Sequence, residues 1–410
     1  MSTNGLQGNF NVSLMLDGEE IGILTQEIGM LYFIEDIFSY SITGKLTFND
    51  RQGILEFGPL TGHEKIVIIY GIDQMFTLEF NIYKINRIIP TWSEAHGKDN
   101  FIEILFVDDW FYNLIGKQYS ISWFEEMGSD IVKHISEHMI QQTEFDKWED
   151  TNEEFEYFYL PYWTPKQGID WIIKRCSGVE SGKSGYLFYN SIVEGEIKAN
   201  FITLEKLLSE PGLFSTADNP LYYFTTDYGF DWNRILSYNL SGIDNLSRFK
   251  LKGGHRKGYD SHQKKFIDVD FNYSDSIGEY TLLGKKSLFE DISEPDTQHI
   301  LSGEVLEEAI ENIYYDDWIK RYCMQQVLSI IVQGHQERLI GSLIDVEWPS
   351  MHKDEMYNKN FGGKYLVKSI THQFGSGSPW YQQKMVLIKN AYEDSDNTKL
   401  LKSVNMNLGE

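Results

Sequence analysis

The sequence predicts an α+β protein that is mainly β, with two antiparallel β-barrel or sandwich domains and an α+β domain inserted between them. Three observations support this fold class. Apolar and polar residues alternate with period 2 toward both ends of the 410-residue chain, whereas helical spacing appears in its middle. Aromatic residues, which favour strands, make up 15% of the chain, and only 9 prolines are present.

The first β domain is predicted over residues 1–115. Apolar Phe10, Val12 and Leu14 alternate with the residues between them, and Leu46 and Phe48 belong to a second alternating run. Further strands are expected at 65–70, 76–89 and 101–107. The last of these runs is apolar on both faces, which predicts a strand that is covered on both sides.

The inserted α+β domain is predicted over residues 116–215. Its clearest element is a helix with Thr164 as N-cap and Pro165 at the first helical position. The apolar stripe of this helix consists of Ile169, Ile172, Ile173 and Cys176. Helical spacing also appears at 109–116 and 129–141, and a strand is expected at 186–189. Residues 123–160 hold eleven acidic residues against two lysines, a net charge of −9.

The second β domain is predicted over residues 216–392, with a polar connector and a helix around 284–323. Its expected strands are 221–226, 234–240, 247–252, 266–273, 327–332, 342–348, 364–374 and 381–389. A basic loop is expected between the third and fourth of these. Residues 248–268 hold seven Lys and Arg against two Asp, a net charge of +5. Residues 393–410 are predicted to be a polar C-terminal tail.

A weak internal repeat links the two β domains. The strands at 65–70, 78–88 and 100–107 form one series, and those at 342–348, 364–374 and 381–389 form another. In both series the third strand runs into a polar segment that contains Asp. The pattern predicts two related β domains that superpose.

Composition excludes several classes of function. The 61 acidic and 36 basic residues give a net charge of −25, which argues against a positively charged clamp on nucleic acid. Two cysteines cannot form a disulfide framework, so Cys176 and Cys323 are expected to be free, buried thiols in a reducing compartment. No secretory signal is apparent, and no apolar run approaches the ~20 residues of a membrane span. Synthesis and folding in the cytoplasm, without membrane insertion, are expected.

One motif suggests metal chemistry. His134, Glu137 and His138 match the H-x-x-E-H spacing of inverted zinc proteases, in which two His on one helix face bind Zn²⁺ and the Glu is the general base. The alternative is an amphipathic helix with exposed His. No downstream helix offers a distinctive third ligand, so we expect no zinc here.

A second motif suggests phosphate binding. Residues 178–184 read Gly-Val-Glu-Ser-Gly-Lys-Ser, which is one residue short of a P-loop. The motif also follows a helix and precedes a strand, whereas phosphate binding needs the opposite order. A flexible loop is therefore expected. We predict no catalytic, cofactor-binding or metal-binding residues, no cofactor and no enzymatic activity.

Three stretches together resemble the baseplate hub family of contractile-tailed, T-even-like bacteriophages. The first spans 37–64 and includes Thr43-Gly44-Lys45-Leu46-Thr47-Phe48-Asn49-Asp50 and Leu60-Thr61-Gly62-His63-Glu64. The second includes Tyr159-Leu160-Pro161-Tyr162-Trp163-Thr164-Pro165, Gly185-Tyr186-Leu187-Phe188-Tyr189 and Phe201-Ile202-Thr203-Leu204-Glu205. The third includes Gly341-Ser342-Leu343-Ile344-Asp345-Val346 and Gly363-Lys364-Tyr365-Leu366-Val367-Lys368-Ser369-Ile370-Thr371-His372.

The resemblance implies a structural hub of a virion tail baseplate. Hubs of this family are ring-shaped homotrimers in which each chain contributes two tail-tube-like β domains, so that three chains present six. Such a ring adapts a threefold central spike to the sixfold tail tube and leaves a channel for DNA. The implied partners are the spike or cell-puncturing protein, the tail tube or tube-initiator protein and baseplate wedge proteins, with DNA passing without specific binding.

Two alternatives stay open at this point. One is the hub of a related contractile injection or secretion machine. The other is a virion-associated zinc metalloprotease that uses His134, Glu137 and His138.

Overall fold

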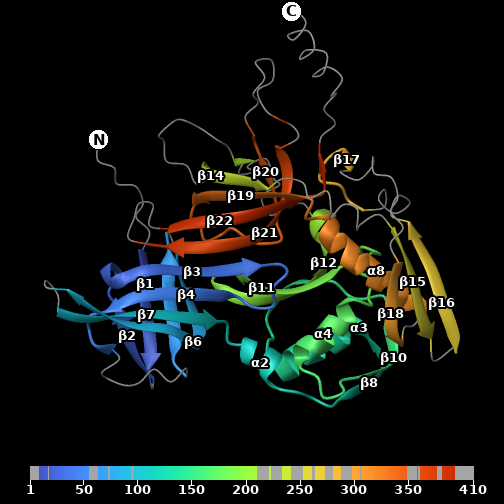
Figure 1. Ribbon diagram of the computed structural model, residues 1–410, viewed down its shortest axis with the longest axis horizontal. Coiled ribbons are helices and arrows are strands. Elements are labelled where there is room, and N and C mark those ends of the chain that lie inside the picture. Colours follow the sequence, from blue (N-terminus) through green and yellow to red (C-terminus); the bar gives the residue numbers. More distant parts are fainter. Residues whose placement is uncertain are drawn as a thin grey trace, which may run out of the picture.

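Residues 9–16, 18–54, 63–72, 74–93, 97–209, 221–222, 233–241, 253–260, 264–272, 280–287, 298–304, 307–348, 358, 361–375 and 381–392 are described in a computed structural model of the chain. Most of them form strands; most of the helices lie within residues 111–209, and a longer one lies at 307–322 (Figure 1). The prediction of a mainly β, α+β protein is confirmed.

The secondary structure consists of many strands and a few helices. The strands of the first part are β1 (Asn9–Leu16), β2 (Glu19–Ile23), β3 (Ile28–Asp36), β4 (Thr43–Asp50), β5 (Lys65–Gly71), β6 (Met75–Ser93) and β7 (Gly97–Val107). The middle strands are β8 (Ser122–Met127), β9 (Phe145–Trp148), β10 (Glu154–Tyr159), β11 (Tyr186–Val193) and β12 (Glu196–Thr203). The remaining strands are β13 (Leu221–Tyr222), β14 (Ile235–Ser241), β15 (Gly253–Asp260), β16 (Lys265–Asn272), β17 (Lys286–Ser287), β18 (Gln298–Glu304), β19 (Gln326–Gln333), β20 (Leu343–Val346), β21 (Gly363–Phe374), β22 (Tyr381–Lys389) and β23 (Ala391–Tyr392). The helices are η1 (Thr25–Glu27), α2 (Phe111–Gly116), α3 (Gly128–His134), η2 (Ile135–Ile140), α4 (Pro165–Ile173), α5 (Leu204–Ser209) and α8 (Glu307–Tyr322).

One 13-stranded sheet runs through the molecule. Its main path is β14-β19-β22-β21-β3-β4-β7-β6-β5-β1-β2, and β20 pairs with both β21 and β13. Antiparallel pairing of β21 with β3 joins the last part of the chain to the first, as Figure 1 shows where β21 lies against β3. The two β-rich blocks expected from alternation therefore share one sheet, a feature that the strand patterns did not indicate.

Among the described residues, buried apolar side chains form three clusters. One draws mainly on residues 10–106, the second on residues 114–201, and the third on 318–388 together with parts of 187–283. The first cluster also receives Phe374 and Tyr381 from the end of the chain. The clusters do not keep strictly to the expected domain limits, because the third also takes in Ile37 and residues 187–208. The domain limits 1–115, 116–215 and 216–392, and the superposition of the two β blocks, stay predictions.

The predicted helix start at Thr164 is confirmed. The Thr164 hydroxyl accepts a hydrogen bond from the Gln167 amide at 3.3 Å, and the Gln167 Oε1 accepts one from the Thr164 amide at 3.0 Å, which forms a capping box. The apolar stripe from Ile169 to Cys176 is buried as expected. The helix expected at 129–141 is present, but its second half, η2, is a π-helix.

In the second half of the chain some expectations are wrong, and others fall outside the described residues. Residues 253–260, expected within a basic loop, form strand β15, and β15, β16 and β18 make a separate three-stranded sheet. The loop expectation was wrong there because β15 pairs with β16 on one side and β18 on the other. Part of the expected connector is also strand, at β17 and β18. The expected strand at 247–252 and the tail at 393–410 lie outside the described residues.

Two further expectations concern the thiols and the membrane. Cys176 and Cys323 are buried and unbridged, as predicted, and burial raises the pKa of both thiols. Across the part of the chain that the structure describes, no helix is both long and apolar enough to cross a membrane.

Candidate functional site

The H-x-x-E-H motif spans the junction between α3 and η2. His134 ends α3, and the wider π-turn that follows carries Glu137 and His138. The two imidazole rings lie 4.6 Å apart between centroids, and Trp123 packs edge-on against His134. Burial, together with the nearby His138, lowers the pKa of His134. Within the described ranges, no group of three or more His, Cys, Asp or Glu side chains is arranged to hold a metal ion.

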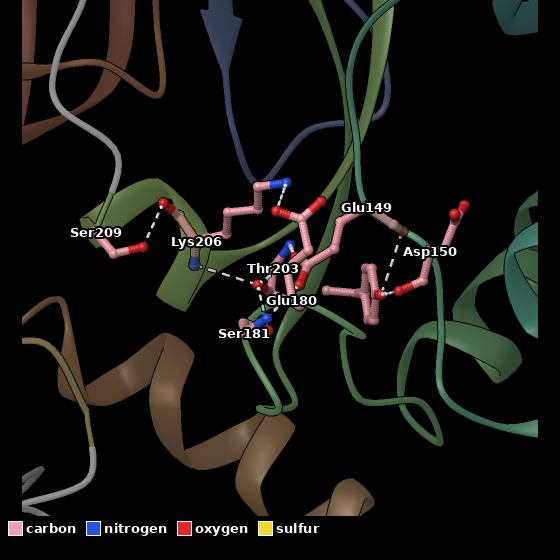
Figure 2. Close-up of polar contacts among 8 residues, drawn as sticks. Glu149, Asp150, Glu180, Ser181, Thr203, Lys206 and Ser209 are labelled. Atoms are coloured by element: carbon pink, nitrogen blue, oxygen red, sulfur yellow. Dashed lines mark hydrogen bonds and ion pairs between the residues drawn. The ribbon is translucent and has the colours of Figure 1, made fainter.

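The P-loop-like segment packs around a buried carboxylate. Glu149 Oε1 accepts a hydrogen bond from the Ser181 amide at 2.9 Å, and Oε2 accepts bonds from the Thr203 amide at 3.1 Å and the Thr203 hydroxyl at 2.6 Å. Figure 2 shows the Glu149 side chain reaching both partners. A Cβ at Gly178 would lie 2.0 Å from Glu149 Oε1, so the loop closes directly on the carboxylate. An internal anion thus takes up the loop amide that a phosphate would need.

Further contacts tie this loop to α5. Lys206 forms an ion pair with Glu180 at 2.7 Å, and the Lys206 amide donates to the Thr203 hydroxyl at 3.2 Å (Figure 2). The segment follows α4 and precedes β11, which is the order expected from the sequence. The arrangement stabilises the loop and the end of β12, and it leaves this loop without a phosphate-binding arrangement of amides.

A buried polar network crosses the β3–β21 seam. Glu35 on β3 lies 2.7 Å from His372 Nε2 on β21, and its other oxygen accepts a hydrogen bond from the Ile192 amide of β11 at 2.7 Å. Both side chains are 1% exposed. The imidazole stacks on Phe33, with ring centroids 4.4 Å apart. One carboxylate therefore connects strands from three parts of the chain.

The network continues from His372 to β22. Tyr381 Oη lies 2.7 Å from His372 Nδ1 and accepts a hydrogen bond from Gln383 Nε2 at 2.9 Å. Arg338 Nη1 donates to Gln383 Oε1 at 2.6 Å. Gln383, Tyr381 and His372 therefore form one connected set of buried polar side chains on β21 and β22. Alternation predicted these strands but not the network; the only sequence signal is a His and a Glu inside otherwise apolar strands.

The ends of the large sheet offer edges for assembly. Strands β14 and β2 end its main path, and residues 82–93 of β6 pair with β7 alone among the described strands. Leu236 on β14 and Ile88 on β6 are exposed apolar side chains beside these edges. Open edges present unpaired backbone N–H and C=O groups, which invite pairing with another chain.

Comparisons with known proteins identify the fold. No protein-family model matches the sequence, and no curated protein matches it. The solved structure of a tail protein from Neisseria meningitidis MC58 aligns over 93% of this chain and 97% of its own, with 12% identity and a TM-score of 0.58. The 43 kDa tail protein of prophage MuSo2 from Shewanella oneidensis aligns over 93% of this chain and 98% of its own, with 11% identity and a TM-score of 0.57.

A third structure is similar over a smaller share of its length. A chain of the half-lidded Francisella PdpA–VgrG complex aligns over 95% of this chain and 59% of its own, with 11% identity and a TM-score of 0.50. The two tail proteins, in contrast, are matched from end to end. The chain therefore has the fold of these two tail proteins.

Proposed function

We propose that the protein is the structural hub of a phage-type tail baseplate and acts without catalysis. The observation that carries this proposal is the match of 93% of the chain to two tail proteins, one of them from a prophage, over 97% and 98% of their lengths. The surroundings of the P-loop-like segment and of the H-x-x-E-H motif support the proposal. Glu149 already binds the P-loop-like segment, and the His134–His138 pair lacks a third ligand among the described residues.

The hub is a homotrimeric ring in this proposal. Each chain supplies two β blocks, here residues 1–115 and 216–392, so that three chains present six. The open edges at β14, β2 and β6 support closure of the ring by pairing between chains. Obligate interfaces bury more than about 2,000 Å², and the 15% aromatic content supplies suitable apolar area.

The ring binds a threefold central spike on one side and the sixfold tail tube on the other, with wedge proteins around it. DNA passes through its channel. Three chains with a net charge of −25 each give −75 per ring. An acidic or uncharged channel wall repels DNA and lets it slide. Replacing acids that face the channel by Lys should leave assembly intact and slow genome ejection; a channel lined mainly by Lys and Arg would refute this role of the charge.

The solution mass tests the proposed assembly. A stable trimer has a mass of about 143 kDa, three times the 47.8 kDa of one chain. Sedimentation velocity across a range of concentrations measures it. A species that stays at 47.8 kDa at every concentration counts against the ring. Detection of the chain in purified particles by mass spectrometry, with labelling at the tail end, tests its place in the virion.

A second candidate is the hub of a contractile injection or secretion machine. The similarity to a chain of the PdpA–VgrG complex favours this candidate. Particles purified from the producing cells decide between the two, since a virion contains a DNA-filled capsid and an injection machine has none.

The metalloprotease alternative is tested by metal analysis of the purified protein. One zinc per chain that is lost on His134→Ala would support it. In the proposed hub, the wild type and the variant have the same substoichiometric metal content.

A further inference from the structure

One face of the large sheet carries two rows of side chains that run across its strands. Strands β14, β19, β22, β21, β3 and β4 lie side by side in this order (Figure 1). Their register aligns a first row, which consists of Ser237, Ile331, Lys384, Thr371, Ile34 and Thr43. A second row beside it consists of Gln333, Gln382, Gln373, Tyr32 and Lys45. We call these two rows the open face.

The other face of the same strands is covered. Side chains alternate along a strand, so Ile330, Ile370 and Met385 point to that side, and their buried cluster also contains Trp318 of helix α8 and Tyr189 of β11. On the open face, Ser237 and Lys384 are exposed, the remaining side chains are half-buried, and none belongs to a buried cluster. Among the described residues, α8 and β11 thus lie on one side of the sheet and leave the open face uncovered.

The open face carries little charge for so acidic a chain. It contains no Asp or Glu, although acidic residues outnumber basic ones by 61 to 36 in the sequence. Its basic residues are Lys384 and Lys45, and Lys45 forms an ion pair with Glu103 at 2.8 Å. Asp36, next to the open face on β3, is paired with Lys368 at 2.5 Å. Hydroxyl and amide side chains therefore dominate this surface.

Closure of the proposed ring decides where the open face lies. Pairing through the edges at β14, β2 and β6 continues the sheet from one copy to the next, and a sheet that closes on itself turns one face toward its axis. The covered face cannot be that one, because helix α8 and strand β11 occupy it. The open face is therefore the one that turns toward the axis.

We propose that the open face is the wall along which DNA passes in the proposed ring. Duplex DNA carries one negative charge per ~1.7 Å of its axis, so unpaired acids on the wall would repel it and clusters of Lys or Arg would hold it. Hydroxyl and amide groups do neither. The net charge of −25 accordingly lies outside the open face. This inference rests on the proposed hub function and names the residues of its channel.

Threading tests the assignment with DNA as the probe. Thr371→Lys combined with Gln373→Lys adds positive charge to the open face of every chain in the ring. The variant trimer should bind a linearised plasmid about tenfold more tightly than the wild type at low salt, and the gain should fall as the salt concentration rises. The same plasmid as a closed circle has no end to thread and should show no gain.

The matched control places the same charges outside the open face. Ser122→Lys combined with Thr143→Lys changes two exposed positions of the middle segment, so linear and closed DNA should bind this variant equally. Sedimentation velocity and thermal unfolding show whether each variant assembles and folds.

Thiol labelling tests the position of the open face without DNA. In the trimer, Thr371→Cys and Lys384→Cys should react with a small maleimide but not with a maleimide joined to a polymer too large for the channel. Lys133→Cys, at an exposed position on α3, should react with both reagents. The native cysteines are buried, so the wild type gives the background.

Three results in a trimeric protein would overturn the channel wall and leave the hub proposal standing. The first is a lysine variant whose affinity does not rise more for linear than for closed DNA. The second is reaction of the open-face thiols with both reagents, which would place them on the outside of the ring. The third is reaction with neither reagent, which would show that protein covers them. A wild type that stays monomeric at every concentration overturns both proposals.

Discussion

At the residue scale, the most informative side chains are buried carboxylates that the protein uses as internal anchors. Asp108, fully buried after β7, accepts hydrogen bonds from the Ile42 amide at 2.8 Å and from Asn190 Nδ2 at 3.0 Å. It thereby connects β7, the start of β4 and strand β11. Glu149 has the same role for the 177–184 loop. Burial removes both carboxyl groups from water, and hydrogen bonds from backbone and side-chain donors replace those to water.

The burial of Asp108 predicts a specific pH dependence. Burial raises the pKa of Asp108 to about 6 from its ordinary value near 3.8. Since the folded state binds this proton more tightly than the unfolded state, the contribution of Asp108 to stability is fully present below pH ~4 and is lost as the pH rises through 6. The ionised form costs on the order of 3 kcal/mol at pH 7. Asn cannot ionise, so Asp108→Asn should remove this contribution. The free energy of unfolding of the variant should therefore rise relative to that of the wild type from pH 4 to pH 7. Urea unfolding at both pH values measures it, and a constant difference would contradict the assignment.

The close contact between Gly178 and Glu149 predicts a second effect. A methyl group at Gly178 would lie 2.0 Å from Glu149 Oε1 and 2.4 Å from Ser181 Oγ. Gly178→Ala should therefore displace the carboxylate from its donors and destabilise the fold by about 2–4 kcal/mol. Gly116→Ala, where nothing lies within 4 Å of the added atom, is the matched control. Equal unfolding midpoints in urea for the two variants would show that the loop does not depend on Glu149.

At the scale of elements, the β3–β21 seam decides how the two β blocks are joined. Backbone pairing from Asp36↔Ser369 to Leu31↔Phe374 forms the seam, and the Glu35–His372 network passes through it to β11 and β22. A sheet seam of this kind lets two blocks act as one body. Its polar residues are buried, so they fix a single register as well as adding stability.

The buried network at the seam predicts that removing the Glu35 carboxylate lowers the free energy of unfolding much more than removing the exposed Asp109 carboxylate. Glu35→Ala leaves His372 Nε2 and the Ile192 amide, both buried, without their hydrogen-bond partner and should cost about 3–5 kcal/mol. Asp109→Ala removes an exposed ion pair with Lys65 and should cost less than about 1 kcal/mol. Urea unfolding of both variants provides the measurement. If the two deletions cost the same, the network has no special part in joining the blocks.

At the scale of the whole molecule, the open sheet edges connect fold and assembly. Strand β14 ends the main path of the sheet, and residues 82–93 of β6 pair with β7 alone among the described strands; both carry exposed apolar side chains. Charged residues on an edge strand are a common means of preventing pairing between chains. In the proposed trimer, these edges are covered by neighbouring copies.

Leu236→Lys and Ile88→Lys should therefore weaken the trimer at least tenfold while leaving the fold of one chain intact. Ile115→Lys makes the same change at an exposed position on helix α2 and should have no effect on association. Analytical ultracentrifugation over a concentration series compares the three variants. If association is unchanged in both edge variants, pairing at these strands is not what holds the copies together.

Local sequence patterns determined much of the secondary structure. The strands at 65–70 and 101–107, the capping box at Thr164 and the buried stripe from Ile169 to Cys176 each follow from a few neighbouring residues. These features depend on side-chain periodicity and on hydrogen bonds between residues close in the chain. The order helix, loop, strand around residues 178–184 was likewise sufficient to argue against a P-loop.

Only the tertiary structure decided how distant parts meet. Glu35 and His372 are 337 residues apart in the sequence, and Phe374 and Tyr381 enter a core built mainly from residues 10–106. The strand status of 253–260 depends on pairing with β16 and β18 rather than on its own Gly- and Lys-containing sequence. Likewise, the outward position of Thr371, Gln373 and Lys384 depends on which face of β21 and β22 is covered. Periodicity specifies that a strand has two faces, but its neighbours in space determine which face is buried.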